Sequence, residues 1–251
     1  MKISRNHPRF RSLETRERLV RGFQSGIVAQ QGLIAHGRGE AFDYLFGETT
    51  PKSSRLATKA AVALLLGARN PVISINGNTA ALVPQDIVKL ARSVPAVLEV
   101  NLFHRSLARE RRIASLLKRN GADQVLGLEA TARMRIRGVA SPRRSVDAHG
   151  IGNADVVLIP LEDGDRAEAL RKAGKAVIAI DLNPMSRTSR SANVTIVDNI
   201  IRAVPELLRI TLRMKPLSKS RLSAIVSNFD NGKNLGKAMQ DMIHYMQGWE
   251  A

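Results

Sequence analysis

Short apolar runs alternate with helical stretches over residues 53–215, and this alternation constrains the fold more than any other feature of the chain. The runs have the length of strands and are rich in Val and Ile, at residues 72–75, 97–100, 124–128, 156–159, 177–180 and 194–197. Nearly continuous apolar strands are typical of a sheet buried on both faces. The sequence therefore predicts an α/β fold, in which a mostly parallel sheet has helices on both faces.

The helical stretches between these runs are predicted at residues 54–66, 85–93, 106–118 and 165–172. Residues 16–24 also have a helical pattern, and a glycine-bearing loop at 32–39 precedes a second predicted helix at 40–46. The C-terminal part, residues 200–248, reads as almost wholly helical, with breaks near Pro216 and at 230–232. Its apolar face suits packing on the domain or on a second subunit.

A single domain, residues 1–251, accounts for this organisation. It comprises a helical N-terminal segment (1–50), an α/β core (51–199) and a helical C-terminal segment (200–251). The length is ample for a buried core, and apolar residues make up 44% of the chain. No segment approaches the roughly 18 apolar residues of a membrane span, and the charged N-terminus is unlike a signal peptide. We therefore expect a soluble cytoplasmic protein.

The absence of cysteine excludes disulfides, iron–sulfur clusters and thiol catalysis. The five histidines form no zinc-binding spacing. The formal net charge of +17 suits either a nucleic-acid partner or small anionic substrates such as ATP. With only nine aromatic residues, the chain lacks the stacking residues of single-stranded nucleic-acid binders. A basic nucleic-acid-binding α/β protein remains the alternative to an enzyme.

Polar residues follow the fifth and sixth apolar runs in an unusual combination. Asp181 and Asn183 end the fifth run, Ser186-Arg187 follows closely, and Asp198-Asn199 ends the sixth run. Ligands of open α/β sheets bind where strands end. Carboxylates and amides can hold a ribose or a base edge, and arginines hold phosphates. This pattern predicts a nucleotide site, and the alternative is that these residues only form turns and helix caps.

The same theme recurs at other strand ends. Amides at Asn76 and Asn78 flank Gly77 after the first run, where a plain turn is the alternative. Asn101, His104 and Arg105 follow the second run. Three acids at 162, 163 and 165 follow the fourth run, where they can cap a helix or hold Mg²⁺. We expect all these groups to lie along one edge of the sheet.

Two glycine patterns in the sequence are candidate phosphate sites. Arg38 lies between Gly37 and Gly39, ahead of a predicted helix that begins near Glu40, so a phosphate could bind at that helix N-terminus. The GxG at 150–152 precedes a strand, whereas the dinucleotide fingerprint must follow one, which argues against a dehydrogenase. The sequence also has no P-loop.

Several longer strings carry a resemblance to a known family. They are GLIAHGRGEAFDYL (32–45), SINGNTAALVP (74–84), EVNLFHR (99–105), ADVVLIPLEDGDR (154–166), IDLNPMSRTSR (180–190) and TIVDNIIRA (195–203), together with HPR at 7–9. In these strings the chain resembles the archaeal phosphopantothenate synthetases, a family also called 4-phosphopantoate–β-alanine ligases. The likeness runs from the N-terminus to about residue 233, while residues 133–144 and the last twenty look variable.

The resemblance implies a Rossmann-like homodimer that uses ATP with Mg²⁺. It implies AMP-forming condensation of (R)-4-phosphopantoate with β-alanine through an acyl-adenylate, on a route to coenzyme A. The product would be 4′-phosphopantothenate. A carboxylate becomes a good acyl donor only when its oxygen carries a leaving group, and the crowded negative charge of that step calls for arginines and a metal ion. An arginine-rich site without an obvious nucleophile fits this chemistry.

The resemblance also assigns site residues. It places ATP contacts at Arg16, Arg38, Asp181, Leu182, Asn183, Arg187, Thr188, Asp198 and Asn199, where Thr188 replaces an expected serine and keeps its hydroxyl. Arg38 and Arg187 are the candidate catalytic residues, acting on phosphates. The candidates for binding 4-phosphopantoate and β-alanine are Asn76, Asn78, Asn101, His104 and Arg105. The sequence identifies neither the metal ligands nor the general base for the amine.

Overall fold

A six-stranded parallel sheet forms the centre of the protein, in a computed structural model that describes residues 4–7, 9–128 and 133–248. The strand order is β3-β2-β1-β6-β7-β8, and every neighbouring pair is parallel. The strands are β1 (Pro71–Ile75), β2 (Val97–Val100), β3 (Val125–Leu126), β6 (Val156–Pro160), β7 (Ala176–Ile180) and β8 (Val194–Ile196). All six predicted strands are confirmed, although β3 is shorter than its apolar run. The middle residue of the HPR string, at position 8, lies outside the described residues.

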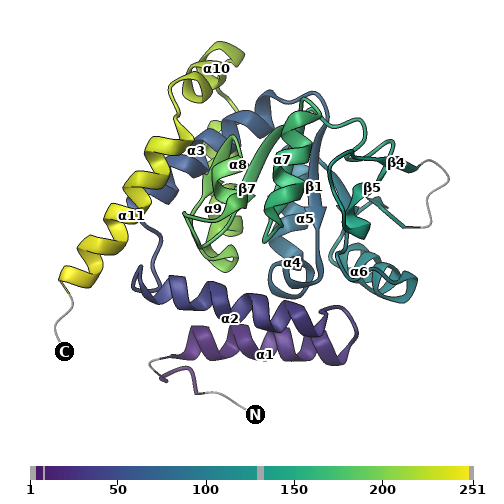
Figure 1. Ribbon diagram of the computed structural model, residues 1–251, viewed down its shortest axis with the longest axis horizontal. Helices are drawn as coiled ribbons and strands as arrows, with labels where there is room; N and C mark the ends of the chain where they lie inside the picture. Colours follow the sequence, from purple (N-terminus) through teal and green to yellow (C-terminus); the bar gives the residue numbers. More distant parts are fainter. Residues whose placement is uncertain (1–3, 8, 129–132, 249–251) are drawn as a thin grey trace.

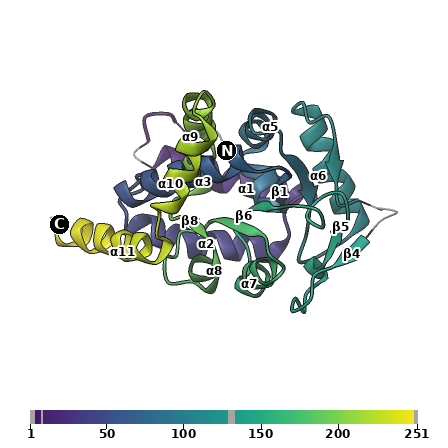
Figure 2. The ribbon, with the colours of Figure 1, turned by 90° about the horizontal axis from the view of Figure 1, so that it is seen from above.

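Helices cover both faces of this sheet, as predicted (Figure 2). Along β7, Ile178 and Ile180 join one apolar core, while Val177 and Ala179 join the other. Because alternate residues point to opposite faces, a strand with two buried faces must be apolar throughout. The first core includes α3 (Lys52–Gly67), α5 (Pro84–Ser93), α6 (Leu107–Arg119) and α9 (Ile200–Met214), and α7 (Gly164–Lys172) belongs to the second.

A small antiparallel hairpin, β4 (Arg133–Arg135) with β5 (Ser145–Asp147), was not predicted. A single turn of 3-10 helix, Pro142–Arg144, leads into β5. Val146 and the nearby Ile136 and Val139 are buried in the second core. A three-residue strand is too short for an alternation of apolar and polar residues to be recognised in the sequence. The hairpin is therefore specified by its packing on the second core rather than by a local pattern.

The N-terminal segment forms two helices, α1 (Phe10–Gln24) and α2 (Gln30–Tyr44). Figure 1 shows them side by side across one edge of the sheet, next to α4 (Gly77–Leu82). The predicted loop at 32–39 and the helix start near Glu40 are therefore wrong, because α2 is continuous through both. Gly32 serves close packing instead, because a Cβ there would lie 2.4 Å from Asn78 Oδ1.

The C-terminal part is helical with the predicted breaks, as α9, α10 (Lys219–Ser227) and α11 (Asn231–Gln247). Asp241 of α11 accepts hydrogen bonds from the backbone N–H and hydroxyl of Ser53, at 3.2 and 2.7 Å. Leu235 and Met242 pack into the body beside Phe46. The end of α11 projects from the body, as Figure 1 shows. No helix within the described ranges is long and apolar enough to cross a membrane.

Candidate active site

A cavity of about 660 Å³ lies between α2 and the strand ends of the sheet. In order along the chain the six parallel strands are arranged 3-2-1-4-5-6, so the direction of winding reverses between β1 and β6. Residues that follow β1, β2, β6, β7 and β8 all line the cavity. Among the predicted site residues, those that line it are Arg38, Asn76, Asn78, His104, Asp181, Leu182, Asn183, Arg187, Thr188 and Asn199.

Asn76 holds the two halves of the sheet together at the reversal point. Its side-chain amide donates to the carbonyls of Pro160 and Leu161, at 2.8 and 3.2 Å. Its Oδ1 accepts from the backbone N–H of Thr79 at 2.9 Å, which caps α4, so the segment after β1 begins a helix where a plain turn was the alternative. Leu161 adopts the left-handed conformation at φ 53° and lines the cavity. This amide is committed to the protein, which suits a positioning role.

The loop after β7 is built by short polar contacts. Asp181 accepts from the Asn183 backbone N–H at 3.0 Å and from the Ser186 hydroxyl at 2.6 Å. Ser186 in turn caps α8 (Arg187–Ser191) by accepting from the Ser189 N–H at 2.9 Å. Turn and cap roles are therefore real here, and the same residues also line the cavity. Burial raises the pKa of Asp181, although Ser186, Asn183 and Arg38 partly oppose the rise.

Helix α8 presents Arg187 and Thr188 to the cavity. The Thr188 hydroxyl donates to the Glu162 carbonyl at 2.7 Å, which fixes α8 against the start of α7. A Cβ on Gly164 would lie 2.3 Å from Arg187 Cβ, so only glycine permits this approach. The Arg187 side chain is 65% exposed, and its one ion pair, to Glu168, is 3.5 Å long. Its guanidinium is therefore available to a ligand.

Four predicted residues do not line this cavity. Asn101 donates to the Ser145 carbonyl at 3.2 Å and so anchors the hairpin. Arg105 pairs with the buried Glu110 at 2.5 Å. Asp198, 1% exposed, accepts from Thr50 at 2.7 Å and from Arg202, and burial raises its pKa despite these partners. Arg16 pairs with Glu40 on the side of α2 that faces α1. These contacts support the site from outside.

Two buried arginines next to the cavity were missed. Arg143, from the hairpin, lines it and binds Asp163 at 2.7 Å as well as Glu162. Arg166 lies beneath, fully buried, and binds the same Glu162. Burial lowers the pKa of each to about 10. Arginine-rich stretches are usually solvated, so no sequence signal distinguished Arg143 from its exposed neighbours.

The acids after β6 act mainly as arginine partners. Asp163 occupies the N-cap position of α7 without making a side-chain cap. Within the described residues, no group of three or more His, Cys, Asp or Glu side chains could hold a metal ion. Mg²⁺ commonly arrives with substrate phosphates and takes only one or two protein carboxylates. Asp163 and Asp181 are cavity-lining carboxylates that fit such a role.

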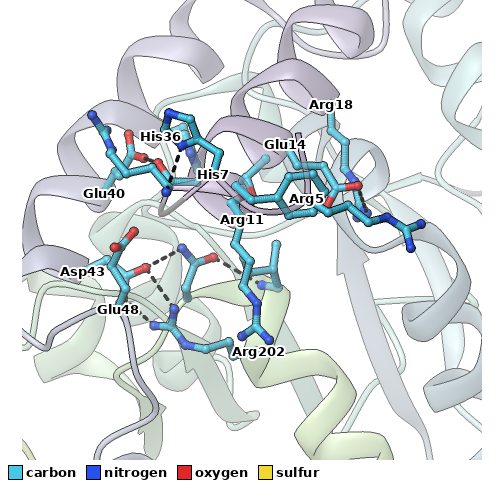
Figure 3. Close-up of a pocket in the computed structure, with 16 residues that line it drawn as sticks. Arg5, His7, Arg11, Glu14, Arg18, His36, Glu40, Asp43, Glu48 and Arg202 are labelled. Atoms are coloured by element: carbon cyan, nitrogen blue, oxygen red, sulfur yellow. Dashed lines mark hydrogen bonds and ion pairs between the residues drawn. The ribbon is translucent and has the colours of Figure 1, made fainter. Parts of the chain in front are cut away.

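A second cavity, of about 510 Å³, lies on the other side of α2. Figure 3 shows Arg11, Arg202, Asp43 and Glu48 around it. His36 and Asn199 line both cavities. The two spaces are thus separated by single side chains of α2 and of the β8–α9 junction.

Comparison with known proteins places this geometry in a family. The family model described as phosphopantothenate/pantothenate synthetase matches residues 53–245. The chain belongs to the phosphopantothenate/pantothenate synthetase family. A protein of Thermococcus onnurineus (strain NA1) named 4-phosphopantoate–beta-alanine ligase is 50% identical over 240 residues, covering 95% of this chain and 91% of the relative. One of the same name from Methanosarcina mazei is 47% identical over 245 residues, covering 98% and 96%. Both alignments span nearly the whole length of each protein.

Glu40 links α2 to α1 and gives a pH-dependent prediction. Burial raises the pKa of Glu40, but hydrogen bonds from Ser12 at 2.5 Å and from Arg16 at 3.0 Å outweigh it, so the pKa falls below 4.5. A lowered carboxyl pKa stabilises the fold above the unfolded-state pKa, and this contribution is lost as the pH falls. Glu40→Gln should cost about 1 kcal/mol at neutral pH. The loss should shrink below about pH 4.5.

Urea unfolding at pH 7 and pH 4 measures this difference. Glu17→Gln on α1 is the matched control, because the Glu17 carboxylate has no hydrogen bond or ion pair to any described residue. A penalty for Glu40→Gln that is equal at both pH values would contradict the linkage.

Proposed function

We propose that the chain catalyses the ATP-dependent condensation of (R)-4-phosphopantoate with β-alanine, giving 4′-phosphopantothenate, AMP and diphosphate, in coenzyme A biosynthesis. The relatives' name describes a ligase that joins 4-phosphopantoate and β-alanine. The observation that carries the proposal is the cavity, where guanidinium, amide, hydroxyl and carboxylate groups from five strand ends meet. ATP is the co-substrate that drives such a ligase.

The ATP half of the site is proposed at the ends of β7 and β8. Asp181, Leu182 and Asn183 would contact ribose or adenine, and Asn199 would bind beside them. Arg187 and Arg38 would bind phosphates from opposite walls, one on α8 and one on α2. Thr188 supplies a hydroxyl at the α8 N-terminus. Arg16 and Asp198 would support this half through their contacts with Glu40 and Arg202.

The acid and amine would occupy the part of the cavity near β1 and β2. His104 and Asn78 line that part, and Asn76, Asn101 and Arg105 hold its walls in place. The carboxylate of 4-phosphopantoate attacks the α-phosphorus of ATP, the bond to the diphosphate oxygen breaks, and an acyl-adenylate forms. Fixed guanidinium groups stabilise the charge of that step without reorganising. Mg²⁺, held by ATP with Asp163 or Asp181, would offset further negative charge.

We also propose a homodimer. Met239, Ile243 and Met246 of α11 are between 38% and 49% exposed, and they repeat at the spacing of one helix face. Within the chain, Leu235 and Met242 of the same helix are buried, but these three side chains are left uncovered. A second copy would cover the remainder. In this proposal the high positive net charge attracts the anionic substrates to the site and does not serve nucleic-acid binding.

The reaction products test the function directly. Purified protein with ATP, Mg²⁺, 4-phosphopantoate and β-alanine should release AMP and diphosphate in step with 4′-phosphopantothenate, as followed by chromatography. ADP in place of AMP would overturn the adenylate route. No turnover, combined with tight binding of random duplex at physiological salt, would favour the nucleic-acid alternative.

Removal of one phosphate-binding guanidinium tests the site. Arg187→Ala should lower kcat/KM by about 100-fold, the scale of losing one oriented group that stabilises transition-state charge. The melting temperature should stay near that of the native protein, since Arg187 makes only one long ion pair. Arg190→Ala, an exposed residue of the same helix that lies outside the cavity, is the matched control. Equal activities of the two variants would remove Arg187 from the phosphate role.

A further inference from the structure

The proposed reaction needs a proton acceptor, and the inference below rests on that proposed function. The amine of β-alanine resembles a lysine side chain, with a pKa of about 10, so at neutral pH it is an ammonium ion without a lone pair. It can attack an acyl carbon only after losing a proton. A general base within the cavity must therefore be unprotonated and have an atom that is not already bonded.

Most candidate bases in the cavity are already committed. Glu162 and Asp163 pair with Arg143, so their carboxylate oxygens are already engaged. Asp181 accepts hydrogen bonds from Ser186 and Asn183. His104 is exposed at the cavity mouth, with its ring 5.0 Å from that of Phe103. Arginines remain protonated and cannot accept a proton, so among the described lining residues these contacts leave one further candidate base.

That side chain is His36, in the middle of α2. Its Nε2 atom is buried and has no hydrogen-bond partner. Buried polar atoms without partners are rare in folded proteins, and one on a residue that lines a cavity calls for an explanation such as a ligand that supplies the missing contact. The residue one turn further along α2, Glu40, does not fill the gap, because Ser12 and Arg16 of α1 occupy its carboxylate.

The surroundings keep His36 neutral. Burial is the largest influence and lowers its pKa below 6.5. Glu40 and Asp43 on the same helix raise the pKa, and Arg16 on α1 lowers it. The carboxylate of Asp43 is itself neutralised by Arg202 of α9. Burial thus favours the neutral imidazole, which is the form that can accept a proton.

We propose that His36 is the general base that deprotonates the ammonium group of the amino-acid substrate. One N–H bond of the ammonium breaks, and its proton passes to the imidazole. The freed lone pair forms the C–N bond to the acyl carbon, and the C–O bond to AMP breaks with its electron pair leaving on the phosphate oxygen. The second proton leaves the nitrogen to water as the adduct collapses to the amide.

The second cavity provides an exit for the first proton. His36 lines both spaces, so a proton accepted on the side of the strand ends can reach water on the side of α1 (Figure 3). The walls of that space carry both arginines and carboxylates, among them Arg11, Asp43 and Glu48, so the proton leaves into a polar space.

Separation of the two half-reactions tests this role. ATP–diphosphate exchange requires 4-phosphopantoate, ATP and diphosphate but no amine. His36→Asn should therefore leave the exchange rate within about threefold of the native rate. Amide formation with β-alanine should fall by about 100-fold or more, the usual contribution of a general base. Hydroxylamine, which is mostly unprotonated at neutral pH, should be acylated by the variant nearly as fast as by the native protein. The variant's amide-forming rate should rise with pH where the native rate is flat.

The controls distinguish the alternatives. His104→Asn should alter both half-reactions alike and leave the shape of the pH profile unchanged. An equal loss with hydroxylamine and β-alanine, or loss of exchange in a folded His36→Asn protein, would overturn the assignment to His36. If this variant does not fold, two further measurements test the proposal: the same assays on His36→Gln, and the pH profile of amide formation by the native protein. A native profile that does not fall at acid pH contradicts the proposal. Absence of exchange in the native protein would instead overturn the proposed function.

Discussion

One buried ionic cluster holds α2 over the sheet, and the cavity depends on it. Asp43 of α2, 3% exposed, accepts from the Asn199 amide at 2.8 Å and from Arg202 at 3.1 Å, across 156 and 159 residues of sequence. Arg202 also binds Asp198 at 2.9 Å. A buried charge is tolerated only when it is paired, so removal of any member would leave the others uncompensated. The cluster thereby fixes Arg38 and His36 against the strand ends.

The remaining polar groups divide into those that shape the cavity and those that face it. The NH2 group and the oxygen of the Asn76 side chain both bond to backbone atoms. Asp181 fixes the loop that leads into α8. By contrast, the Arg187 side chain is 65% exposed, and the His36 Nε2 atom has no hydrogen-bond partner within the protein. Rigid walls around a few available groups are what a ligase needs, since most of its rate comes from positioning and fixed charge.

The sequence predicted the sheet, its helices and the edge that carries the site, because buried strands and their polar ends leave a strong local pattern. It failed where tertiary packing overrides local signals. The glycines of α2 suggested a loop, yet they lie within a continuous helix, and Gly32 lets that helix approach Asn78. Arg143 belongs to a segment that looked variable in the sequence, and only the fold buries it. The resemblance assigned Asp198 and Arg16 to ATP, and in the structure each is paired with a protein side chain outside the cavity.

In the proposed reaction the cavity activates the carboxylate of 4-phosphopantoate by transferring AMP to it. The fate of the carboxylate oxygen distinguishes this route from others. With 4-phosphopantoate labelled with ¹⁸O in its carboxylate, the account predicts one labelled oxygen in the AMP product, detected by mass spectrometry. Label that appears in inorganic phosphate, with none in AMP, would mean an acyl phosphate intermediate and would contradict it.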